Sequence, residues 1–219
     1  MCGRFSQSLP LIQYAHALDP HWNPEKDGRS STWNLAPSQM SWAFLSGGEE
    51  ILAAVLKWGF MPAWADAKAA KPINAKVETA ETSPYFRHAW KTGRCLIPAD
   101  GFYEWTQKES GAKQPWFIHR KDDVPILFAG IWEHNPKLGD STFAILTMAS
   151  DGEMKSIHSR KPVMLDRENA QRWITPGLSP SEIREIANSA MKDDLFDWNR
   201  VSTQVNNPRN DGPELLLPT

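Results

Sequence analysis

Residues 94–148 read RCLIPADGFYEWTQKESGAKQPWFIHRKDDVPILFAGIWEHNPKLGDSTFAILTM, and this stretch decides the fold. It holds five runs rich in β-branched and aromatic residues, separated by Gly, Pro, Asp or Asn, a pattern typical of β-strands. These runs are residues 94–97, 101–105, 116–119, 126–132 and 143–148. The middle of the chain is therefore predicted to be dominated by strands.

Outside this stretch, the sequence predicts two further strands and four helices. The strands are residues 51–58 and 163–165. Ser179, Pro180 and Glu182 form the signature of a capping box at a helix start. The other helices are residues 11–18, a segment opened by Ser83-Pro84 and ending near Gly93, and a short helix capped by Asp166 and running through Ile174.

The helices are interspersed irregularly among the strands, without the regular βαβ alternation of a doubly wound sheet. We therefore predict an α+β fold. Its expected form is a single domain over residues 1–219, with a curved, largely antiparallel or mixed, barrel-like β-sheet and several peripheral helices. A length of 219 residues with 41% hydrophobic and 23% charged residues suits one packed domain.

Composition excludes several classes of protein. The longest uncharged apolar run, residues 51–56, is far too short to cross a bilayer. No basic segment followed by an apolar segment opens the chain, so export is not expected. Two distant cysteines, Cys2 and Cys95, make neither a disulfide framework nor a Cys-x-x-Cys zinc motif. We expect a cytoplasmic protein without a membrane partner, metal or cofactor.

Charge and tryptophan content bear on nucleic-acid binding. The net charge of −2 does not indicate a nucleic-acid binder, but residues 57–94 hold seven Lys or Arg against three acidic residues. The chain also has eleven tryptophans. Trp64, beside Pro62 in a loop-like stretch, is the candidate for stacking on DNA bases.

Cys2 follows the initiating Met1 directly. If Met1 is removed, Cys2 carries a free α-amine and a thiol on adjacent carbons. This 1,2-aminothiol condenses with an aldehyde twice, first to an imine and then to a five-membered thiazolidine. An α-amine has a pKa of about 7.7–8, against about 10.4 for lysine, so it is a ready nucleophile near neutral pH. Cys2 is therefore a candidate nucleophile.

Three segments offer helpers for Cys2. The amide of Asn74 can donate and accept hydrogen bonds. Glu104, flanked by aromatic residues, is a candidate general acid or base, and His158 can exchange protons near neutral pH. Each also has an ordinary interpretation, since an Asn between strands is usually in a turn and a Glu in such a run usually faces solvent. Periodicity alone does not select these three.

The selection comes from a resemblance carried by five motifs in order along the chain. They are MCGRF at 1–5, WNLAP at 33–37, NAKVET at 74–79, GFYEW at 101–105 and HSRKP at 158–162. With the closing segment 205–218, this set resembles the SOS-response-associated peptidase (SRAP) family over essentially the whole chain. Together the motifs are highly specific.

The resemblance implies a protein that binds single-stranded DNA and traps abasic sites covalently through the residue after Met1. The family's catalytic positions map onto Cys2, Asn74, Glu104 and His158. The expected DNA contacts are Arg4, Asn34, Trp64, Lys76 and Arg160. Two departures are visible: Lys76 stands where arginine is common and lacks its bidentate geometry, and Lys161 replaces a residue that is often apolar or arginine.

The expected reaction is a single-turnover cross-link. The Cys2 amine attacks the open-chain aldehyde of the abasic sugar, Glu104 relays the proton, and the sulfur closes the ring, which shields the site from strand cleavage. Asn74 is expected to orient the Cys2 terminus, and His158 to promote sugar ring opening or reversal by lyase-type chemistry. Met1 is expected to leave by autoproteolysis or through an aminopeptidase. Such a trap needs no partner subunit, so a monomer is expected, associated with the nucleoid when bound to DNA.

Two alternatives remain open. An amidohydrolase of the N-terminal-nucleophile type also begins Met-Cys-Gly and uses the cysteine to attack a carboxamide. Arg4-Phe5, in place of an aliphatic strand start, and the other motifs count against this alternative. A non-catalytic binder of single-stranded or modified DNA would use the tryptophans and the basic stretch equally well.

Overall fold

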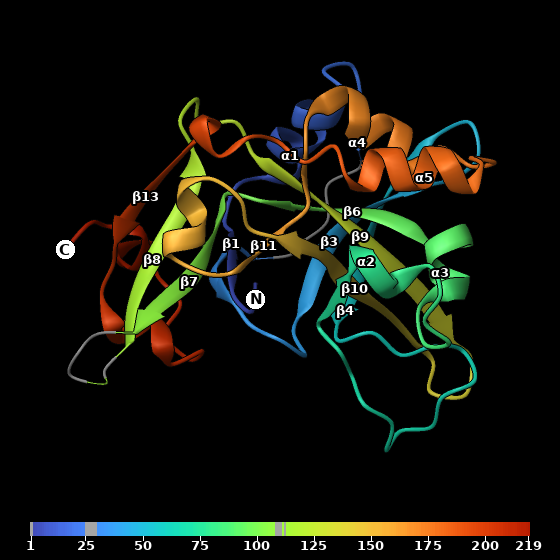
Figure 1. The fold of residues 1–219 in the computed structure, drawn as a ribbon, viewed down its shortest axis with the longest axis horizontal. Helices are drawn as coiled ribbons and strands as arrows, with labels where there is room; N and C mark the ends of the chain where they lie inside the picture. The colour runs from blue at the N-terminus through green and yellow to red at the C-terminus, as the bar shows by residue number, and fades with distance from the viewer. Residues whose placement is uncertain (1, 25–29, 108–110, 112) are drawn as a thin grey trace.

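Two β-sheets with helices around them make up the computed structural model, which describes residues 2–24, 30–107, 111 and 113–219 (Figure 1). The strands are β1 (Phe5–Gln7), β2 (Thr32–Leu35), β3 (Met40–Ser46), β4 (Ile51–Trp58), β5 (Asn74–Lys76), β6 (Arg94–Ala99), β7 (Gly101–Gln107), β8 (Lys113–Arg120), β9 (Ile126–Asn135), β10 (Asp140–Ala149), β11 (Arg160–Pro162), β12 (Met164–Leu165) and β13 (Phe196–Arg200). The α-helices are α1 (Leu11–Leu18), α2 (Val77–Ala80), α3 (Arg87–Thr92), α4 (Arg167–Ile174) and α5 (Pro180–Ala187). Short 3-10 helices are η1 (Glu153–Ser156), η2 (Asp193–Leu195), η3 (Thr203–Asn206) and η4 (Pro213–Leu216).

Five strands close into a barrel. The order β10-β4-β3-β6-β9 returns to β10, because β9 and β10 also pair with each other. The β4–β10 pairing is parallel and the other four are antiparallel, so the barrel is mixed. Strands β5 and β11 attach to β10, and β12 attaches to β9. The predicted α+β fold with a curved, barrel-like sheet is confirmed.

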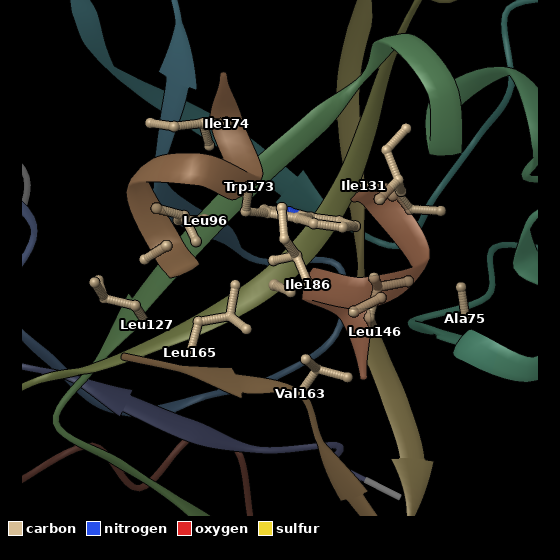
Figure 2. Close-up of a cluster of buried hydrophobic side chains, with 14 of the residues drawn as sticks. Ala75, Leu96, Leu127, Ile131, Leu146, Val163, Leu165, Trp173, Ile174 and Ile186 are labelled. Atoms are coloured by element: carbon tan, nitrogen blue, oxygen red, sulfur yellow. The ribbon is translucent and has the colours of Figure 1, made fainter. Parts of the chain in front are cut away.

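Alternation along the barrel strands separates two core clusters. In β9, Phe128 points into the barrel and joins an inner cluster that also contains Cys2, Phe5 and Trp58. Leu127 and Ile131 point outward into an outer cluster beneath α4 and α5. Figure 2 shows this outer cluster packed around Trp173. The barrel interior therefore contains the predicted nucleophile.

The second sheet is antiparallel, in the order β13-β8-β7-β1-β2. On one face, Phe102, Ile118 and Phe196 join the inner cluster of the barrel. On the other face, Tyr103 and Phe117 pack with the C-terminal segment in a third, smaller cluster. This second sheet therefore covers the part of the barrel core that contains Cys2.

Most predicted elements are confirmed, including the helix over Leu11–Leu18 and the Ser179 capping box of α5. The helix start at Ser83-Pro84 is wrong. Residues 84–86 form a turn instead, with the Arg87 amide bonded to the Ser83 carbonyl at 2.8 Å, and α3 begins at Arg87 without a side-chain cap.

None of the helices that the described residues form has the length and apolar character needed to cross a bilayer. Over the same residues, no group of three or more His, Cys, Asp or Glu side chains is arranged to hold a metal ion.

Candidate active site

The N-terminal segment brings Cys2 beside strand β7. Phe5 lies opposite Phe102 in the antiparallel β1–β7 pair, and the Tyr103 amide donates to the Arg4 carbonyl at 2.9 Å. Continuing this register brings residue 3 level with Glu104. Cys2 is fully buried. Burial, and after it the nearby Glu104 carboxylate, raise the pKa of the Cys2 thiol well above its ordinary value, so the sulfur stays protonated at neutral pH.

Asn74 holds the Cys2 backbone. Strand β5 runs parallel to β10 with Asn74 opposite Ile145. From there the Asn74 Nδ2 donates to the Cys2 carbonyl oxygen at 2.8 Å. The Asn74 Oδ1 is buried and accepts no hydrogen bond from the described residues. This amide therefore fixes the peptide unit next to the Cys2 nitrogen and has one unused acceptor.

Glu104 and His158 line one small pocket. Its apolar walls come from the inner cluster, and its polar lining includes Arg160 and Lys161. The apolar residues common to the pocket and to the cluster that contains Cys2 are Phe102, Ile118, Met154 and Ile157. Glu104 is only 4% exposed, so it does not face solvent as an ordinary strand glutamate would. The structure thus brings Cys2, Asn74, Glu104 and His158 to one region of the barrel.

His158 lies in the loop between η1 and β11, where the backbone fixes its ring. Its amide donates to the Met154 carbonyl at 3.0 Å, and the Arg160 amide lies 2.9 Å from His158 Nδ1. Nδ1 also lies 3.1 Å from the Arg160 carbonyl oxygen. The backbone of Arg160 therefore fixes the orientation of the imidazole at the edge of the pocket that Glu104 also lines.

Two of the predicted DNA-contact residues, Arg160 and Lys76, lie near Thr147 of β10. Lys76 is exposed and lies opposite Thr147 in the β5–β10 pair. Arg160 is bound bidentately by Glu78, with Nη2 at 2.9 Å from Oε2, and Nη2 also donates to the Thr147 carbonyl. Hydrogen bonding from Arg160 lowers the pKa of the Glu78 carboxyl. The guanidinium is thus positioned by a carboxylate that sequence reasoning did not identify.

Arg4 and Asn34 bind the C-terminal segment. Arg4 Nη1 donates to Asn34 Oδ1 at 2.7 Å and to the Val205 carbonyl at 2.8 Å. Asn34 is 1% exposed, and its Nδ2 donates to the carbonyls of Val205, Asn207 and Asn210. These contacts give Asn34 a structural role, while its contact with DNA stays a prediction.

Trp64 is one of the few large apolar side chains on the surface. It is 59% exposed, and its ring meets Tyr85 edge to face at 5.6 Å between centroids. Tyr85 itself donates to the Ala70 carbonyl. The indole is therefore supported on one side and open to solvent elsewhere, as a base-stacking residue requires.

Lys161 is a functional candidate that sequence reasoning noticed only as a departure from the family pattern. Its side chain is 4% exposed, and its Nζ lies 2.7 Å from Asp193 Oδ1 and also contacts Asp151. Burial alone would lower the pKa of Lys161, but the bonds to both aspartates outweigh it and raise that pKa. Lys161 is therefore a charged residue in the wall of the Glu104–His158 pocket.

Three comparisons with known proteins bear on the family of this chain. The family model for SOS response associated peptidase (SRAP) matches residues 1–208. The chain is 38% identical to the Abasic site processing protein YedK of Escherichia coli (strain K12), and the alignment covers 100% of both chains. It is 34% identical to the Abasic site processing protein YoaM of Bacillus subtilis (strain 168), over 99% of this chain and 97% of that protein.

A solved structure from Bacteroides thetaiotaomicron superposes with a TM-score of 0.84 over 100% of both chains. Its sequence is only 21% identical, so this likeness concerns the fold alone. A phage-related protein of Bordetella bronchiseptica superposes with a TM-score of 0.77, with 30% identity over 91% of this chain and 94% of that one.

Proposed function

Because the chain belongs to the SOS response associated peptidase family, we propose that it captures abasic sites in single-stranded DNA through a covalent bond to Cys2. Its relatives YedK and YoaM carry the name abasic site processing protein, which supports this substrate. The observation that carries the proposal is the 2.8 Å hydrogen bond from Asn74 to the Cys2 carbonyl. It anchors the carbonyl group of the same residue whose α-nitrogen would attack the sugar.

The proposed reaction begins once Met1 has been removed, which frees the Cys2 amine. Hydrolysis of the Met1–Cys2 peptide bond at this same site would make the removal autocatalytic. The amine adds to C1′ of the open-chain sugar, and loss of one water gives an imine. The thiol then adds across the C=N bond, so the sulfur binds C1′, the nitrogen gains a proton, and a thiazolidine closes.

Each catalytic residue has a task set by its position. Glu104 is buried beside Cys2 and would carry protons during addition and water loss. His158, in the wall of the same pocket as Glu104, would help to open the sugar ring, or reverse the adduct by lyase-type chemistry. While Met1 is attached, burial and then Glu104 raise the pKa of the Cys2 thiol, so the sulfur is held protonated until the amine has been freed.

The DNA strand is proposed to be held by cations and by stacking. Arg4, Lys76 and Arg160 would contact phosphates, which makes binding weaker as the salt concentration rises. Trp64 would stack on a base, and Asn34 would act by holding Arg4 and the C-terminal segment. The protein would act once, as a monomer in the cytoplasm, and the closed ring would protect the strand from cleavage.

A denaturing gel tests the proposal. The protein is incubated with a single-stranded oligonucleotide that carries one abasic site, and a covalent adduct appears as a shifted band. Cys2→Ala keeps an N-terminal amine but has no sulfur, so it should give no stable band. Glu104→Gln should form the adduct more slowly than wild type. No band from wild type overturns the proposal, and equal rates for Glu104→Gln and wild type remove Glu104 from its role.

The N-terminal-nucleophile amidohydrolase is less well supported. That chemistry needs an activated sulfur, whereas burial and Glu104 keep the Cys2 thiol protonated. Release of ammonia from glutamine by the purified protein would support the amidohydrolase. A non-catalytic DNA binder makes a different prediction. Cys2→Ala and wild type would bind single-stranded DNA with the same affinity, and neither would form an adduct.

A further inference from the structure

Three residues lie in register across the second sheet, beginning at the active site. Glu104 of β7 lies opposite Trp116 of β8, and Trp116 lies opposite Arg200 of β13. Directly opposed residues in antiparallel strands point to the same face. These strands lie side by side in Figure 1. The sheet therefore extends the Glu104 side of the site with an aromatic ring and then a cation.

A second tryptophan joins this face. Trp198 of β13 lies opposite Ile118, which lines the Glu104–His158 pocket. Trp116 and Trp198 are both partly buried, and they pack against the inner cluster that contains Cys2. The Trp116 Nε1 donates to Thr106 Oγ1 at 2.9 Å, which fixes the orientation of that indole. The Trp116 ring is thus held by a hydrogen bond, and both tryptophans remain partly exposed.

Arg200 is an exposed cation above this surface. Its guanidinium carbon lies 5.3 Å from the centre of the Trp116 ring. No acidic side chain in the described parts of the chain forms a salt bridge with Arg200. The acid of the same strand, Asp197, alternates to the other face and lies 3.9 Å from Lys121. Arg200 therefore presents positive charge beside the site, and none of the acids that the structure describes neutralises it.

We infer that Trp116, Trp198 and Arg200 form a subsite for the nucleotide next to the abasic sugar. An unpaired base stacks on the indoles, and Arg200 binds the backbone phosphate of that nucleotide. Strands lie about 4.8 Å apart, so Trp116 is one strand and Arg200 two strands, about 10 Å, from Glu104. That spacing suits a neighbour of the reacting sugar. The inference rests on the proposed function, because the subsite is placed by its distance from an abasic sugar that reacts at Cys2 and Glu104.

The combination of chemical groups identifies the partner. An aromatic surface with a free cation matches a base joined to a phosphate, as in sites for single-stranded nucleic acid. The other explanation is that the tryptophans only pack the sheet and that Arg200 only covers one ring. Binding to DNA without a lesion separates these two explanations, since it needs no reaction at Cys2.

The test measures fluorescence anisotropy of a labelled oligothymidine without an abasic site, over a range of salt concentrations. Arg200→Gln should raise the dissociation constant several-fold at low salt and reduce the slope of log K against log salt by about 0.7, the value for one lost phosphate contact on a single strand. Trp116→Leu and Trp198→Leu should each weaken binding about fivefold or more, since stacking stabilises each base by about 1–3 kcal/mol. Trp116→Phe should retain part of that affinity.

Matched controls lie on other parts of the molecule. Arg172→Gln removes the same charge from α4, and Trp22→Leu removes a half-buried tryptophan that packs on the outer cluster. Both should bind the oligothymidine like wild type. Thermal melting identifies any variant that is unfolded, and the exposed Arg200→Gln should melt like wild type. Wild-type affinity and slope in folded Arg200→Gln and in the tryptophan variants overturn the subsite.

The cross-linking gel separates this inference from the proposed function. If wild type forms the adduct while all three variants bind intact DNA like wild type, the function stands and the subsite is wrong. If the variants weaken binding but wild type forms no adduct, the subsite binds DNA and the covalent function is wrong. If wild type does not bind single-stranded DNA at all, both are wrong.

Discussion

At the scale of residues, the chemistry depends on one cysteine whose two reactive groups differ in state. The Cys2 thiol is buried and protonated, while the α-amine needs only the removal of Met1 to become a nucleophile. The Asn74 side chain donates a hydrogen bond to the Cys2 carbonyl oxygen and so fixes the backbone that carries both groups. In the proposed reaction the nitrogen bonds first and the sulfur second, in keeping with this difference.

The state of the Cys2 thiol can be measured by alkylation. In molecules that retain Met1, iodoacetamide at pH 8 should modify Cys2 far more slowly in the folded protein than in urea. Each unit by which the pKa rises lowers the thiolate fraction about tenfold, and burial blocks access as well. Peptide mapping distinguishes Cys2 from Cys95, which is also buried with a raised pKa. Equal rates in folded and unfolded protein would contradict the burial of the sulfur.

Asn74→Ala tests the positioning of the nucleophile. It removes the only side-chain hydrogen bond to the Cys2 carbonyl seen among the described residues. Misplacing a reacting group by about 1 Å costs up to roughly 100-fold in rate, so we expect adduct formation to slow by about one order of magnitude or more. Affinity for intact single-stranded DNA should stay near that of wild type. An unchanged rate of adduct formation would show that Asn74 does not orient Cys2.

Sequence could predict the catalytic candidates but not their partners. Cys2, Asn74, Glu104 and His158 were identified through motifs, and the structure brings them together. Glu78, which binds Arg160, and Lys161, which lies in the pocket wall, depend on contacts between distant segments. Nothing in the local sequence indicates which carboxylate a given cation will meet. The role of Asn34 in holding the C-terminal segment is hidden for the same reason.

At the scale of elements, the loop that carries His158 is held from two sides. Lys161 binds Asp193 at 2.7 Å, and Asp193 Oδ2 accepts from the Met154 amide at 3.0 Å in η1. The Met154 carbonyl in turn accepts from the His158 amide. The lysine therefore positions the histidine through Asp193 and one turn of helix.

Lys161→Met should destabilise the protein and disturb His158. Hydrogen bonds to charged groups contribute about 1.5–3 kcal/mol, so we expect a loss of about 1–3 kcal/mol in the free energy of unfolding in urea. The control is Lys121→Met, which removes an exposed lysine 3.9 Å from Asp197 and should cost less than about 1 kcal/mol. Equal losses for the two variants would contradict a structural role for the buried lysine.

The Arg160–Glu78 pair predicts a dependence of stability on pH. Because Arg160 lowers the Glu78 pKa in the folded protein, the pair stabilises above about pH 4.3, the ordinary glutamate value, and this contribution is lost as pH falls through the lower folded value. Glu78→Gln should therefore melt below wild type at pH 6, and the difference should shrink towards pH 3. The control is Glu50→Gln, because Glu50 is exposed and forms no salt bridge with another residue that the structure describes. A difference that does not change with pH would show that the pair is not coupled to folding.

Elements with local signals were predictable and short paired strands were not. The Ser179 capping box and the Asp166 cap mark α5 and α4 in the sequence itself. Strands β1, β5 and β11 have three residues each and no distinctive periodicity. They form because they pair with longer strands: β1 pairs with β7, and β5 and β11 pair with β10. These are the strands next to the active site, so the least predictable elements position it.

At the scale of the whole molecule, the active site forms where the two sheets meet. The second sheet supplies Glu104 and, through β1, the approach of Cys2, whereas β5 and the loop before β11 bring Asn74 and His158 from the barrel side. The runs of β-branched and aromatic residues, with irregularly placed helices between them, predict a curved, barrel-like sheet. They do not indicate which strands close it, because closure requires β10 to pair with β9 and with β4, and Thr142 of β10 pairs with Lys57 of β4, 142 − 57 = 85 positions earlier.

The measurement that tests the central claim most directly is the intact mass of the adduct with an abasic oligonucleotide. The predicted mass is that of the chain without Met1, plus the oligonucleotide, minus one water, and Cys2→Ala should give no such species. An adduct that retains Met1, or one that Cys2→Ala forms equally well, would contradict a bond through the amine and sulfur of Cys2.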